Sequence, residues 1–259
     1  MDIHKPKPWR GWREFLKEYV IIVAGVLTAL AGEQAVESFH RAEQARFAER
    51  AMRLELGDDD GPQAYGRVLI GRCLDYRLAQ IRDGATSATA DELRRWVSAY
   101  VPPVRTWDSE AWKAVSSSDA GNFMGADKLI EWSAAYRALP KLDETNHREA
   151  QLAAELRDAL PASGELSEMD RQNLRRLTAQ LRFTNIWLER GSEVFLARTR
   201  RLGAAVPVAT QQALLSQARG LYGDCVAPPD LAAPVGGQDQ KANLRGFAGW
   251  TAAARPTPP

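Results

Sequence analysis

Hydrophobic positions follow two different patterns along this chain. The segment from Tyr19 to Gly32 contains no charged residue, whereas apolar and charged residues alternate at three- and four-residue spacing from there to about Val226. That spacing is the period of an amphipathic helix, and valine, isoleucine and threonine runs are rare outside the apolar segment. We therefore expect an all-α protein: an N-terminal transmembrane helix that continues into a stalk, followed by an irregular helical bundle.

The charge-free segment is short for a membrane span. Its 14 residues rise about 21 Å as a helix, less than the roughly 30 Å of a hydrocarbon core. A helix that also includes Phe15 and Leu16 before the segment and extends to Phe39 after it is long enough, because flanking charged side chains can reach the headgroups. We expect a transmembrane anchor over residues 19–39, after a cytoplasmic basic and aromatic leader over residues 1–18.

Two sets of residues give this anchor its expected contacts. Four small residues recur at helical spacing and form one flat face on which another helix can pack closely: Gly25, Thr28, Ala29 and Gly32. Four aromatic residues stand among basic ones before or at its start, as in an interfacial aromatic belt: Trp9, Trp12, Phe15 and Tyr19.

The apolar segment has two other interpretations. A basic leader, a short apolar region and Ala29-Leu30-Ala31 are also the three parts of a cleavable signal peptide, although Glu14 and Glu18 are unusual in one. A buried core helix is the third interpretation. More basic residues precede the segment than follow it closely, which predicts a cytoplasmic N-terminus. We expect a single-pass protein of a bacterial inner membrane with its C-terminal domain in the periplasm.

The residues from Glu18 to Leu30, followed by Glu33 to Glu37, resemble the N-termini of uncharacterised single-pass bacterial membrane proteins. Those proteins share the pattern E-x-x-I-V-x-G-V-x-x-A-L. A weaker similarity covers Trp107 to Ser118 and Leu129 to Tyr136. The resemblance implies an extracytoplasmic helical domain and implies no chemistry.

The rest of the chain predicts a periplasmic helical domain over residues 40–225. Gly57-Asp58-Asp59-Asp60-Gly61-Pro62 should end the stalk, because glycine and proline terminate helices. Further helices are expected over 63–82, 89–100, 108–117, 126–139, 142–160, 167–201 and 211–221. The helix expected over 89–100 begins with a capping box formed by Thr89 and Glu92. Residues 226–259, rich in proline, glycine and alanine, form a loosely ordered tail.

The helix over 167–201 has the strongest pattern. Its apolar residues keep heptad-like spacing: Leu174, Leu177, Leu181, Leu188 and Phe195. Phe183, Ile186, Trp187 and Val194 add a neighbouring apolar face, which is too broad for a two-stranded seam. We therefore expect this helix at the centre of the bundle.

Motifs for chemistry are absent from the sequence. The three histidines, His4, His40 and His147, stand apart from any cysteine or carboxylate set at zinc-ligand spacing. Ser116-Ser117-Ser118-Asp119 lacks a nucleophile elbow, and no nucleotide-binding glycine motif occurs. The formal net charge of +1 gives no field that favours nucleic acid. We expect no enzyme activity, no metal, no cofactor and no nucleic-acid partner.

The two cysteines, Cys73 and Cys225, lie too far apart in sequence for a C-x-x-C motif. A disulfide between them is favoured in a periplasmic domain, and two unrelated buried thiols are the alternative.

Together, the apolar segment, the helical pattern and the absence of catalytic motifs predict a structural or protein-interaction role. The expected partners are membrane lipid and a membrane protein, as accessory subunit or homo-oligomer. The other hypothesis is a periplasmic module that binds a small molecule or lipid among Trp96, Trp107, Trp112, Trp132 and Trp187.

Overall fold

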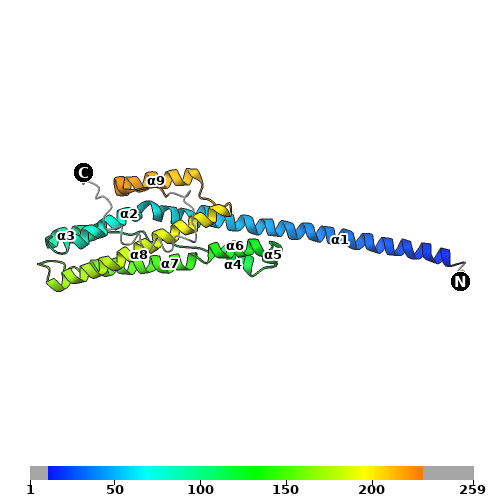
Figure 1. Cartoon of the computed structure of the whole chain (residues 1–259), viewed down its shortest axis with the longest axis horizontal. Coiled ribbons are helices and arrows are strands. Elements are labelled where there is room, and N and C mark those ends of the chain that lie inside the picture. Colours follow the sequence, from blue (N-terminus) through cyan, green and yellow to red (C-terminus); the bar gives the residue numbers. More distant parts are fainter. Residues whose placement is uncertain (1–10, 230–259) are drawn as a thin grey trace, which may run out of the picture. The chain divides into compact units, whose positions relative to one another are not determined.

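The computed structural model describes residues 11–229, and this part of the chain is helical without strands. The first helix, α1, spans Trp12–Leu54 and continues without interruption into a π-helix, η1, at Glu55–Asp60. The next helix, α2, follows directly at Gly61–Gly84 (Figure 1). The expectation of an all-α protein with a long N-terminal helix is confirmed.

The predicted helix break from Gly57 to Pro62 is wrong. In the π-helix the Gly61 N–H donates to the Leu56 carbonyl five residues back. This wider turn leaves room for Pro62 near the start of α2, where its ring would clash with a carbonyl in a regular α-helix. A side chain at Gly61 would meet the Leu56 carbonyl oxygen at 2.7 Å and Val206 Cγ2 at 2.8 Å. The glycine therefore permits close packing rather than ending the helix.

The chain forms two compact units. Unit 1 comprises residues 1–52 and 110–130, and unit 2 comprises residues 53–109 and 131–259. Besides α1, unit 1 contains α4 at Glu110–Ser116, α5 at Asp119–Phe123 and the beginning of α6 at Ala126–Tyr136. The short helix α5 was not predicted. Its Phe123 ring lies 5.5 Å from the guanidinium carbon of Arg41 on α1.

Unit 2 is built around α8, at Glu168–Arg201, which packs against α2 and against α7, at Leu139–Asp158 (Figure 1). Helices α3, at Ala90–Ala99, and α9, at Val208–Tyr222, also contact this core, and a 3-10 turn follows at Gly223–Cys225. The capping box of Thr89 and Glu92 is confirmed. A second capping box joins Ser167 and Asp170 at the start of α8.

The heptad row on α8 is buried as expected, with all of its members in the core: Leu174, Leu177, Leu181, Leu188 and Phe195. The neighbouring aromatic face is different. Phe183 is 56% exposed and Trp187 is 59% exposed, and their ring centroids lie 6.1 Å apart. The helix lies at the centre of unit 2, but the face that it buries is narrower than the apolar face expected from the sequence.

Candidate functional site

The apolar part of α1 is not covered by the rest of the described chain. Large side chains stand exposed on all sides of the helix, and Ile21 reaches 70% exposure. Among the described residues, one continuous helix, Trp12–Gly84, contains a stretch long and apolar enough to cross a membrane, with a mean hydropathy of 1.7. Soluble monomers rarely expose an apolar surface of this extent.

The four small residues lie on this open surface. A side chain built at Gly25 or Gly32 would meet no other atom within 4 Å. The Thr28 hydroxyl donates to the Ala24 carbonyl at 2.8 Å, so its hydrogen bond is made within the helix. Gly25, Thr28, Ala29 and Gly32 are therefore available for contact with another helix.

The aromatic residues that the structure describes lie along the start of α1. Ring centroids are 5.8 Å apart between Trp12 and Phe15, and 6.2 Å apart between Phe15 and Tyr19. Trp9 lies outside the described residues. The three rings form a continuous row at the start of the apolar segment, which begins with Tyr19.

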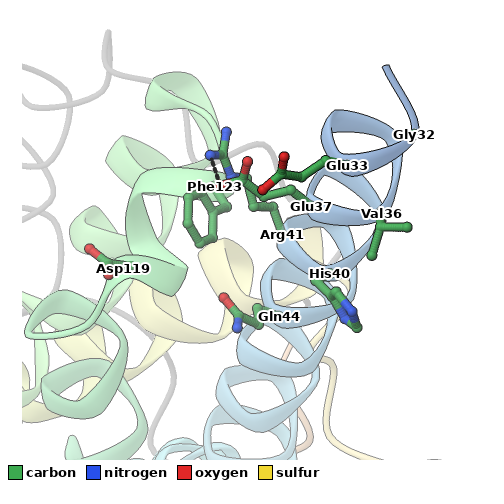
Figure 2. A pocket seen from close by; sticks show the side chains of 9 residues that line it. All are labelled: Gly32, Glu33, Val36, Glu37, His40, Arg41, Gln44, Asp119 and Phe123. Carbon is green, nitrogen blue, oxygen red and sulfur yellow. Dashed lines mark hydrogen bonds and ion pairs between the residues drawn. The ribbon is translucent and has the colours of Figure 1, made fainter. Parts of the chain in front are cut away.

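A shallow groove of about 610 Å³ lies beside the end of the apolar segment, between α1 and α5 (Figure 2). Arg41 points into it, next to the Phe123 ring, and forms an ion pair with Glu37. Carboxylates of Glu33 and Asp119 also line it. Across the described residues, no group of three or more His, Cys, Asp or Glu side chains could hold a metal ion.

A buried charged centre in unit 2 was missed by the sequence reasoning. The Arg67 guanidinium on α2 makes two hydrogen bonds of 2.8 Å to the Glu149 carboxylate on α7, and both side chains are almost completely buried. Arg67 also donates to the Asn185 side-chain oxygen on α8, and Asn185 donates to the Gly71 carbonyl at 3.1 Å. The three helices of the core are thus joined by one polar network.

One pattern pointed to this network. Buried polar residues recur every seven positions on α8, beside the leucine row: Thr178, Asn185, Ser192 and Thr199. A polar row at a core spacing indicates buried hydrogen bonds. Arg67 itself gave no such indication, because arginines at helical spacing usually face solvent.

More ionisable groups surround the centre. Burial raises the pKa of Glu189 to about 7, and the nearby Glu193 adds to this rise. Burial and the neighbouring Arg67 lower the pKa of Arg105 to about 10. The Arg105 backbone N–H donates to Asn146 Oδ1 at 2.8 Å, which fixes the backbone of the connection between α3 and α4. Neither Glu189 nor Arg105 is a nucleophile with an adjacent base.

A buried carboxyl group lies at the π-helix. Asp60 is 1% exposed and its Oδ1 accepts a hydrogen bond of 3.1 Å from the Asp108 N–H. Burial raises the pKa of Asp60 to about 7, the Asp108 hydrogen bond opposes this rise, and the Glu55 charge adds to it. Glu55 in turn accepts a hydrogen bond of 2.7 Å from the Tyr136 hydroxyl.

The two cysteines are joined in the structure. A disulfide links Cys73 on α2 to Cys225, with 5.3 Å between the Cα atoms. The chain on either side of Cys225 also contacts α2. The Arg77 guanidinium carbon lies 4.9 Å from the Tyr222 ring centroid, and the Ala227 N–H donates to the Leu69 carbonyl at 3.3 Å.

The five tryptophans of the alternative hypothesis have different environments. Trp132 is almost completely buried, Trp187 is exposed, and Trp112 belongs to unit 1. Trp107 stands edge-on to Phe195 in the core of unit 2, with ring centroids 6.1 Å apart. Trp96 is half-buried, and its ring lies against Gly84. These positions do not favour one binding site that all five tryptophans share.

Comparison of the chain with known proteins gave no match among protein-family models, curated proteins or solved structures. The function is therefore inferred from the geometry of the chain itself.

Proposed function

We propose that this protein is a single-pass, membrane-anchored helical protein with a structural or interaction role, as an accessory subunit of a membrane complex. Its N-terminus lies in the cytoplasm and unit 2 lies in the periplasm of a bacterium. The observation that carries the proposal is the apolar stretch of α1, which is exposed in the described chain and has a small-residue face without a partner. Uncharacterised single-pass bacterial membrane proteins are the group to which we assign it.

The aromatic row and the disulfide support the same topology. Trp12, Phe15 and Tyr19 stand at the start of the apolar stretch, where an amphipathic ring can lie at headgroup level. The Cys73–Cys225 disulfide lies in unit 2, and disulfides persist in oxidising compartments such as the periplasm. The basic residues of the leader favour its retention in the cytoplasm.

Membrane fractionation of the full chain tests the anchor. We expect the protein to remain in the membrane pellet after carbonate extraction, and an intact mass that includes Met1 or Asp2. A mass that begins near Gly32 would establish a cleaved signal peptide and refute the anchor. Reporter fusions after Pro259 test the topology: an enzyme active only in the periplasm should be active there, and a cytoplasmic reporter should not.

The small-residue face is tested by two paired substitutions. Gly25→Leu with Gly32→Leu fills the face, and we expect loss of self-association or of co-purified membrane proteins. Ala24→Leu with Ala31→Leu is the matched control, because it also adds two leucines seven residues apart. These leucines lie about a quarter turn around the helix from Gly25 and Gly32. If both pairs leave every association unchanged, the proposed contact surface is wrong.

A further inference from the structure

Phe183 and Trp187 form an exposed aromatic patch on α8. Each lies two positions from the buried Asn185, about 200° around a helix, so both stand on the side away from the core of unit 2. More than half of each residue is exposed, and the ring centroids lie 6.1 Å apart at an interplanar angle of 66°. Single exposed apolar side chains are ordinary on a protein surface, whereas adjoining aromatic rings are typical of the centre of an interface.

Two arginines flank the patch on the same side of α8. Arg176 precedes Phe183 by seven residues and Arg190 follows it by seven, and seven residues are almost two full turns. Both arginines are exposed. We define the outer face of α8 by these four residues, Arg176, Phe183, Trp187 and Arg190. It is about 21 Å long, with the aromatic rings near its centre and a guanidinium at each end.

The outer face carries excess positive charge. Arg190 pairs with Glu193 at 2.9 Å. Within residues 11–229, Arg176 instead has hydrogen bonds of 3.3 Å to the neutral side chains of Gln180 and Asn173, and no ion pair. A partner that covers this face would bury the charge of Arg176, and burial of an unpaired charge is costly. The complementary partner therefore supplies a carboxylate opposite Arg176.

This arrangement fits a protein surface better than a lipid surface. A helix that lies on a membrane carries apolar residues along the whole of one face. On α8 the side that bears the patch is polar for three turns before Phe183, where Gln172, Arg176 and Gln180 are exposed. Interfaces between proteins have the observed composition instead, an aromatic centre with a polar rim in which arginine is frequent.

We propose that the outer face of α8 is a docking surface for an acidic amphipathic helix of a partner protein. Apolar side chains of that helix pack on Phe183 and Trp187, and one of its carboxylates pairs with Arg176. A straight ridge of four turns suits a second helix, because the side chains of two helices interdigitate along such ridges. The opposite side of α8 is held in the core of unit 2 by the leucine row and by Asn185, so docking orders little of the backbone.

Site-specific photocrosslinking of the full chain in its native membranes tests this surface. The photoreactive amino acid p-benzoylphenylalanine replaces Trp187 in one protein and, as the control, Val208 in another, because Val208 is 68% exposed on α9. We expect position 187 to crosslink to a different protein, within a helical segment that carries carboxylates. Added to the position 187 protein, Arg176→Glu should reduce the yield about tenfold, the size of a charge-assisted hydrogen bond. Arg219→Glu, at an exposed arginine on α9, should leave the yield unchanged.

Several results would overturn the proposal: equal yields from positions 187 and 208, crosslinks only to lipid or to a second copy of this chain, a contacted segment without carboxylates, or a yield that Arg176→Glu does not change. Phe183→Ala is the second variant, and it should also reduce the yield about tenfold. Neither Arg176 nor Phe183 is in the core, so the unfolding midpoint of both variants should equal that of the native chain. The inference rests on the proposed interaction role. Recovery of the chain outside the membrane would refute the anchor and leave the crosslinks from position 187 to be scored in that fraction.

Discussion

Replacing Asp60 by asparagine should stabilise the protein above neutral pH and change little in acid. The carboxyl is buried in the π-helix, and its pKa rises from 3.8 to about 7 on folding. A raised pKa means that the folded state prefers the protonated form. Stability from this group is therefore complete below pH 4, and it is lost as the pH rises through 7.

The magnitude follows from the two pKa values. Each unit of difference corresponds to about 1.4 kcal/mol, so the full penalty of ionised Asp60 is at most about 4 kcal/mol. Between pH 5.5 and 8 only the part up to pH 7 remains, which is about 2 kcal/mol. Asparagine has no charge to bury, and its side-chain oxygen can still accept the hydrogen bond from the Asp108 N–H.

Denaturant unfolding of the full chain in detergent at pH 5.5, 7 and 8 measures this effect. The difference in unfolding free energy between Asp60→Asn and the native chain should grow by about 2 kcal/mol across that range. Glu189 also has a pKa raised to about 7, but it titrates in both proteins and cancels in the difference. Parallel stability curves for the two proteins would refute the buried, raised-pKa carboxyl.

Three further predictions concern stability, each measured by the same unfolding assay. Gly61→Ala should cost about 1 to 3 kcal/mol, because its Cβ would collide with Leu56 and Val206, whereas Gly220→Ala on α9 meets no atom within 4 Å and should be neutral or stabilising. Replacing Cys73 and Cys225 together by serine should cost about 2 to 5 kcal/mol, and reduction of the native chain should reproduce the loss. Glu149→Gln should cost about 3 to 5 kcal/mol because Arg67 is left buried without its counter-charge; replacing both residues by methionine should restore most of that loss.

Helices were predictable from this sequence where local rules agree with packing. The leucine row of α8, its beginning after Ser167 and the capping box at Thr89 all follow from periodicity and side-chain hydrogen bonds within a few residues. The π-helix was not predictable in this way. Gly57, Gly61 and Pro62 disfavour a helix locally. At Gly61 a side chain would meet both the Leu56 carbonyl oxygen of the π-turn and Val206, and the approach of Val206, far along the chain, follows from no local rule.

The exposed surfaces show the same division. The absence of charge between Tyr19 and Gly32 was enough to identify the apolar stretch of α1, and the structure leaves that stretch exposed. Phe183 and Trp187 were expected in a bundle interior because they are apolar and lie next to the leucine row. Their exposure depends on where α2 and α7 contact α8, which no local rule determines.

The buried charged centre has a further consequence for α8. Its leucine row repeats nearly identically every seven residues, so the apolar contacts alone would tolerate a shift of the helix by two turns. Such a shift would bring Thr178 or Ser192 opposite Arg67 in place of Asn185, and the shorter side chains could not both accept from Arg67 and donate to the Gly71 carbonyl. A buried ion pair adds little net stability over an apolar pair of similar volume, but an unsatisfied one is costly. We therefore expect the network of Arg67, Glu149 and Asn185 to contribute mainly to specificity. In one register of α2, α7 and α8 its buried polar groups form their hydrogen bonds with one another, and a shifted register would leave some of them without partners.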